Sequence, residues 1–154
     1  MNREITFKDI LELLVSIAEA GYSEYSQIAK SNYEEELKFL FHDLAEMKMR
    51  QREIYSHYLN TLSSFYNAKL QGDYRLYMEG LMYTVNNFLD KADINNREEV
   101  FVYAFTIEKN AIILLQELKE LMPENEGEKV SKILAETHRS VANLFEIKML
   151  RKAS

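Results

Sequence analysis

The 154-residue sequence contains no cysteine. This absence excludes disulfide bonds, cysteine nucleophiles, thiolate zinc sites, and iron–sulfur or thiolate-bound iron centres. Any metal centre would therefore have to be built from carboxylate and imidazole ligands.

Glycine and proline are also scarce, with only four and one in the whole chain. These residues supply most of the tight turns that a β-rich protein needs. Because they are so few, the sequence predicts an almost wholly helical, all-α fold.

Long apolar runs are missing as well, and no stretch approaches the 18 residues of a membrane span. The first ten residues lack the apolar core of a signal peptide, so we expect a cytoplasmic protein with no membrane partner.

The 19 basic and 25 acidic residues give a net charge of −6, which argues against a nucleic-acid surface. Glycine-rich phosphate loops and nucleophile-elbow motifs are absent too.

Hydrophobic residues recur at helical spacing in five stretches, separated by polar clusters and by Gly72 and Pro123. Capping boxes are expected at Thr6, with Asp9, and at Ser31, with Glu34. Asn95 and Asn96 precede two acids and should start a later helix. The predicted helices span about residues 6–30, 31–68, 73–89, 96–122 and 126–151.

This pattern predicts a single domain over residues 1–154, a four-helix bundle made of two helical hairpins. The long crossover between the hairpins, residues 62–95, carries a short extra helix. We expect Ile54 and Phe145 to belong to the core-facing stripes of their helices.

Polar residues interrupt these apolar stripes at Lys48, Gln51, Glu108, Thr137 and Ser140. An ionised side chain in the core costs several kcal/mol unless it is paired. We therefore hypothesise a buried ion pair between Lys48 and Glu108, with hydrogen bonds from the other three residues. In the alternative interpretation, Lys48 extends out to solvent and Glu108 is protonated or hydrated.

Three segments carry a resemblance to a known family: DILELLVSIAEAGYSEY (9–25), LKFLFHDLAE (37–46) and IEKNAIILLQELK (107–119). The chain resembles the rubrerythrin-like branch of the ferritin-like diiron-carboxylate superfamily. Such proteins hold two metal ions with one Glu from each of two helices and a Glu-x-x-His pair from each of the other two. The resemblance implies a ferritin-like bundle and a homodimer.

The metal ligands of that family are mostly replaced here, and the chain contains no Glu-x-x-His motif. The six ligand positions fall on Ala18, Lys48, Gln51, Glu108, Thr137 and Ser140. Only Glu108 keeps its acid, so no metal, cofactor or catalytic residue is expected. The favoured interpretation is a degenerate ferritin-like protein that acts as an interaction or structural homo-oligomer, not as an enzyme.

Two other interpretations remain open. Glu19, Glu136 and His138 lie next to lost ligand positions and could rebuild a site with Glu108. The chain would then be a diiron-type oxidoreductase, a peroxidase or ferroxidase, using iron or another divalent metal. Alternatively, the vacated core could be the apolar pocket of a small-molecule carrier, with Lys48 and Glu108 as polar anchors.

Several remaining features favour structural roles. His42, Glu46, Glu53 and His57 share one helix face, which we expect to be solvated, and His138 should lie at the edge of the core. The ten tyrosines, Tyr25 among them, are expected to serve mainly in packing or at an interface. The apolar face of residues 74–88 is where we expect a dimer interface.

Overall fold

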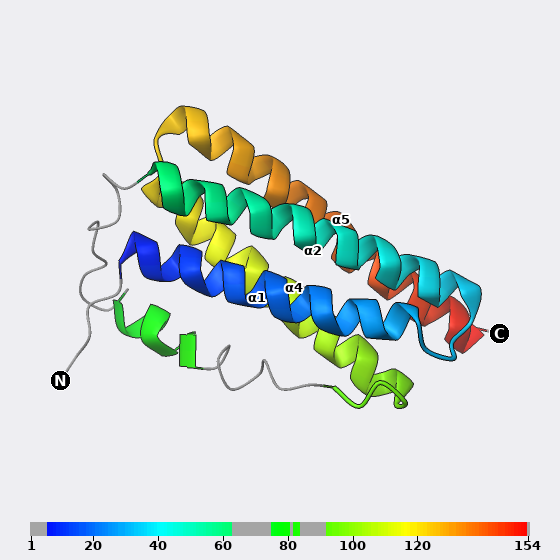
Figure 1. Cartoon of the computed structure of the whole chain (residues 1–154). Coiled ribbons are helices and arrows are strands. Elements are labelled where there is room, and N and C mark those ends of the chain that lie inside the picture. The colour runs from blue at the N-terminus through cyan, green and yellow to red at the C-terminus, as the bar shows by residue number, and fades with distance from the viewer. Residues whose placement is uncertain (1–5, 63–74, 81, 84–91, 154) are drawn as a thin grey trace.

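The chain folds into long helices that lie alongside one another (Figure 1). This computed structural model describes residues 6–62, 75–80, 82–83 and 92–153. Its long helices are α1 (Phe7–Ala29), α2 (Glu35–Thr61), α4 (Arg97–Leu121) and α5 (Glu124–Ala153). The all-α, two-hairpin bundle predicted from the sequence is confirmed.

The capping box predicted at Thr6 is confirmed, and the helix start predicted at Asn96 is also capped. At α1, the Thr6 hydroxyl accepts from the Asp9 backbone N–H at 3.3 Å, and the Asp9 carboxylate accepts from the Thr6 N–H at 2.9 Å. At α4, the Asn96 side chain accepts from the Glu99 N–H at 3.2 Å. These bonds satisfy backbone donors that a helix start otherwise leaves unpaired.

The expected boundaries of α2 are wrong, and those of α5 differ from the observed helix by two residues at each end. No capping box forms at Ser31, because its hydroxyl donates to the Ile28 carbonyl at 2.6 Å and closes the end of α1. Glu34 is the N-cap of α2 and makes no side-chain capping bond. The helix ends at Thr61, not near residue 68. Similarly, α5 begins at Glu124, directly after Pro123.

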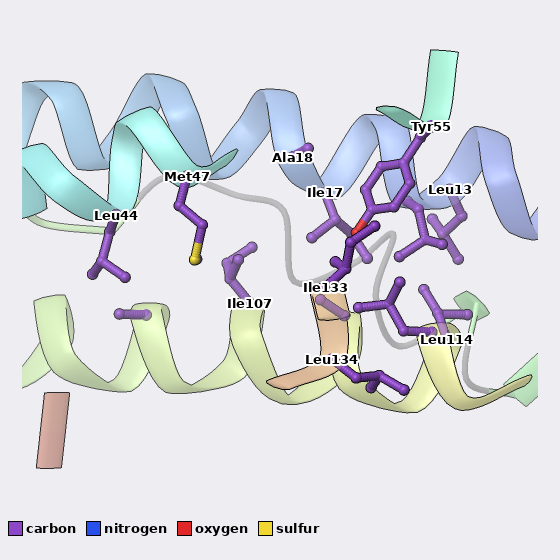
Figure 2. Packing of buried hydrophobic residues seen from close by; sticks show 14 of the residues in the cluster. Leu13, Ile17, Ala18, Leu44, Met47, Tyr55, Ile107, Leu114, Ile133 and Leu134 are labelled. Atoms are coloured by element: carbon purple, nitrogen blue, oxygen red, sulfur yellow. The ribbon is translucent and has the colours of Figure 1, made fainter. Parts of the chain in front are cut away.

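The helices pack as a square in which α1 contacts α2 and α4, while α5 contacts α2 and α4. Consequently α2 and α4 lie on one diagonal of the bundle. Figure 2 shows apolar side chains from different helices meeting along the bundle axis. At one end, Tyr25 packs edge-on against Phe41 at 5.5 Å and Tyr103 at 6.3 Å between ring centroids.

Two residues expected in the core-facing stripes lie outside the core. Ile54 is 36% exposed, and Phe145 is 57% exposed. Both lie at the edge of a stripe, where helical spacing alone does not decide which side chains the neighbouring helix covers.

The predicted crossover helix lies only partly within the described residues. Residues 75–80 and 82–83 are helical, and Met78 is fully buried in the same hydrophobic core. The remainder of the predicted 73–89 helix lies outside the described residues. No helix in the described part of the chain is both long and apolar enough to cross a membrane.

Candidate functional site

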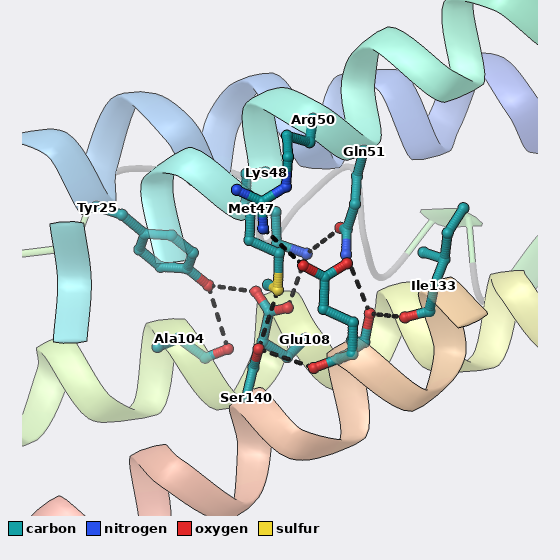
Figure 3. A network of polar contacts seen from close by, with 11 residues as sticks. Tyr25, Met47, Lys48, Arg50, Gln51, Ala104, Glu108, Ile133 and Ser140 are labelled. Atoms are coloured by element: carbon teal, nitrogen blue, oxygen red, sulfur yellow. Dashed lines mark hydrogen bonds and ion pairs between the residues drawn. The ribbon is translucent and has the colours of Figure 1, made fainter. Parts of the chain in front are cut away.

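An ion pair lies at the centre of the bundle (Figure 3). The Lys48 Nζ atom is 2.7 Å from Glu108 Oε1, and the two side chains are 1% and 0% exposed. Lys48 comes from α2 and Glu108 from α4, so the pair spans the diagonal of the square. The structure thus contains the ion pair hypothesised from the sequence, and Lys48 does not extend out to solvent.

Hydrogen bonds extend from the ion pair to α5. The Lys48 ammonium donates to Gln51 Oε1 at 3.1 Å, and Gln51 Nε2 donates to the Thr137 hydroxyl at 3.3 Å. Thr137 in turn donates to the Ile133 carbonyl at 2.8 Å. Lys48, Gln51 and Thr137 are therefore each hydrogen-bonded, as buried polar side chains usually are.

Tyr25 extends the network to α1, a role that the sequence analysis missed. Its phenol donates to Glu108 Oε2 at 2.7 Å, so both carboxylate oxygens of Glu108 are engaged. Burial, followed by the nearby Glu108 charge, raises the pKa of Tyr25 well above its usual range. The phenol therefore stays protonated and remains a donor. The signal available in the sequence was Glu108 itself, because a buried carboxylate needs donors for both oxygens.

Ser140 does not belong to the ion-pair network, which corrects the sequence expectation. Its hydroxyl lies 3.0 Å from both Met47 Sδ and the Glu136 carbonyl. A serine in a helix can bond the carbonyl four residues earlier, and this local bond holds the Ser140 side chain on α5.

Two small residues of α1 line this part of the core. Ala18, at one of the six family ligand positions, is 1% exposed, and its methyl side chain cannot bind a metal ion. At Gly21, an added Cβ would lie 3.2 Å from Lys48 Cγ and 3.4 Å from Lys48 Cδ. Glycine at position 21 therefore leaves room for the aliphatic stem of Lys48 as it enters the core.

The structure does not bring together the candidates for a rebuilt metal site. Glu19 pairs with Arg52 at 3.0 Å, and Glu136 pairs with Arg50 at 2.7 Å, both at the bundle surface. His138 is exposed rather than at the core edge, because it projects from the outer side of α5. Of the predicted candidates, Glu108 alone lies in the buried network.

The histidine-bearing face of α2 is solvated, as expected. His42, Glu46, Glu53 and His57 are all exposed. The single close contact recorded among them is between His42 Nε2 and Glu46 Oε1, at 3.2 Å. Across the described ranges, no three His, Asp or Glu side chains are grouped so that they could hold a metal ion.

Comparison with solved structures identifies the fold. The chain is similar to a protein from Thermotoga maritima provisionally described as a ferritin-like diiron-carboxylate protein, with a TM-score of 0.74 and 21% identity over the full length of both chains. No protein-family model and no curated protein matches this sequence. The fold is therefore ferritin-like, and its function must be argued from its own residues.

The buried ion pair predicts a large cost for removing one partner. Lys48→Met leaves the Glu108 carboxylate buried without its counter-charge, so we expect unfolding free energy to fall by about 3–5 kcal/mol. Urea unfolding followed by circular dichroism measures this change. The control is Lys109→Met at an exposed site on α4, which should change stability by no more than about 0.5 kcal/mol. A loss below about 1 kcal/mol for Lys48→Met would contradict a tightly coupled pair.

The glycine beside Lys48 gives a second prediction. Alanine is favoured over glycine inside a helix by about 1 kcal/mol. Gly127→Ala in α5 should gain part of this stabilisation, because the atom nearest to the added Cβ is 3.9 Å away and nothing crowds it. Gly21→Ala should gain nothing or lose stability, because its Cβ would crowd Lys48. Equal gains in melting temperature for the two variants would show that Gly21 is not needed for the lysine.

Proposed function

We propose that this protein is a ferritin-like scaffold without a resident metal centre, which acts through protein–protein contact as a homodimer and not as a diiron oxidoreductase. The observation that carries the proposal is the Lys48–Glu108 ion pair at the centre of the bundle. The other polar side chains of the network contribute only neutral amide and hydroxyl groups.

The residues at the bundle centre do not fit a pair of iron ions. Two such ions in this fold need several carboxylates and two imidazoles to balance their charge. Here the ammonium of Lys48 contacts Glu108, and the neighbouring Gln51 and Thr137 are neutral. A cation brought to Glu108 would have to displace Lys48 and leave its charge buried, which is strongly unfavourable.

Nearby acids offer little to a rebuilt site. Glu19 and Glu136 are each held by an arginine at the surface. Turning either carboxylate inward would break its ion pair and bring a second negative charge into the core. These contacts support a structural role for both residues.

Exposed apolar side chains support assembly as the mode of action. In the described part of the expected interface, Leu76, Tyr77 and Tyr83 are 56%, 53% and 73% exposed, whereas Met78 is buried in the core. Met78 and the partly buried Met82 thus pack the segment against the core, while the three exposed side chains face outward. Aromatic residues of this kind are enriched in the buried centres of protein interfaces.

Metal analysis tests the metal-free part of the proposal. Protein from cells supplied with iron, manganese and zinc should contain far less than one metal ion per chain by plasma mass spectrometry. Glu108→Gln should not change that content, because Glu108 is a partner of Lys48 and not a ligand. Two metal equivalents per chain, lost in Glu108→Gln, would overturn the proposal.

Light scattering tests the dimer. The wild-type chain should have the mass of a dimer, and Tyr77→Glu combined with Tyr83→Glu should convert it into a folded monomer. The matched control is Phe39→Glu, which changes an equally exposed aromatic residue on α2 and should leave the dimer intact. A monomeric wild type, or dissociation only in Phe39→Glu, would contradict the proposed interface.

A further inference from the structure

The short crossover helix, residues 75–80 and 82–83, lies at the outside of the bundle (Figure 1). Its sequence from Tyr77 to Tyr83, YMEGLMY, reads almost the same in both directions about Gly80. The two methionines, Met78 and Met82, pack against the hydrophobic core. The two tyrosines are 53% and 73% exposed. The inward and the outward residues of this helix are therefore each arranged symmetrically about the glycine.

Gly80 lies at the centre of the exposed face of the crossover helix. Leu76 and the two tyrosines fall within about 60° of the glycine around the helix axis, because successive residues of a helix are about 100° apart. All three side chains are exposed. The Arg75–Glu79 ion pair lies away from this face, since both residues are about 100° or more from Gly80. The described part of the face is thus apolar and carries no charge.

No contact within the described residues explains why position 80 is a glycine. Apart from its chain neighbours and the backbone of its own helix, a Cβ added at Gly80 would meet no heavy atom of these residues within 4 Å. At Gly21, by contrast, an added Cβ would lie 3.2 Å from Lys48 Cγ. Glycine is among the least favourable residues inside a helix. Gly80 therefore weakens its helix without making room for another described part of the chain, and the space beside it is open to a second molecule.

The exposed face is complementary to a second copy of itself. In a two-fold symmetric contact, residue i of one copy meets residue j of the other, and j meets i. If two crossover helices meet antiparallel with the two-fold axis at Gly80, residues three positions before the glycine lie level with residues three positions after it. These residues are Tyr77 and Tyr83. Because the described face carries no charge, it offers no ion pair to a charged ligand, whereas an identical apolar face covers it.

We propose that the homodimer forms where two crossover helices cross at Gly80, with Tyr77 of each copy beside Tyr83 of the other. The missing side chain of Gly80 lets the two backbones approach closely, and the four tyrosines surround the point of contact. Tyrosines near the centre of an interface often contribute much of its binding energy. This inference rests on the homodimer proposed above and adds the residue at which the two copies meet.

The dissociation constant of the dimer, measured by sedimentation equilibrium, tests the crossing point. Gly80→Ala adds one methyl group for which the single chain has room, so the variant should fold normally while dimerisation weakens at least tenfold. Gly127→Ala is the matched control, because it makes the same change at a glycine of α5 and should leave the dissociation constant unchanged. Circular dichroism of both variants verifies that they are folded.

The absence of cysteine from the chain allows a second test, of geometry. A disulfide bond forms only between residues whose Cα atoms come within about 7 Å of each other. At a concentration where the wild type is dimeric, Gly80→Cys should therefore give covalent dimers on mild oxidation. Gly127→Cys should give far fewer, because position 127 lies outside the proposed contact.

Two results would overturn the proposal. One is a Gly80→Ala variant that dimerises as tightly as the wild type, and the other is a Gly80→Cys variant that forms no more covalent dimer than Gly127→Cys. If the wild type is dimeric and dissociates in the Tyr77→Glu, Tyr83→Glu variant, either result rejects only the crossing at Gly80 and leaves the proposed interface standing. A monomeric wild type would reject both.

Discussion

The structure depends on one electrostatic constraint, which is that the ammonium of Lys48 and the carboxylate of Glu108 are both removed from water. Moving either charge alone into the core would cost several kcal/mol. The two groups lie 2.7 Å apart, and Tyr25, Gln51 and Thr137 continue the hydrogen bonding outward. Since these residues come from α1, α2, α4 and α5, satisfying the charges fixes how all four helices meet.

This constraint also explains neighbouring choices of residue. Gly21 gives up helix propensity, and the space without a Cβ is occupied by the stem of Lys48. Tyr25 is packed by Phe41 and Tyr103, which hold its ring so that the hydroxyl reaches Glu108. Because the pair and its hydrogen bonds join residues of different helices, we infer that it specifies one arrangement of the helices more than it adds stability. The scaffold role proposed above requires such a specific bundle geometry.

Much of the fold could be predicted from sequence, because local chemistry decides it. The capping bonds at Thr6 and Asn96 need only residues three positions apart. The ion pair could be predicted because the two opposite charges interrupt apolar stripes in a bundle. Ser140 could not be placed correctly, since whether it bonds its own helix or the network depends on side-chain rotamer. Ile54 and His138 were misjudged because exposure at the edge of a stripe depends on how closely α2 and α5 approach.

Anomalous diffraction from crystals grown with ferrous iron tests the central claim most directly. The account predicts electron density for the Lys48 ammonium against Glu108 and no iron peak between the long helices. Two peaks at the bundle centre bridged by carboxylates, or a Lys48 side chain turned out into solvent, would contradict it.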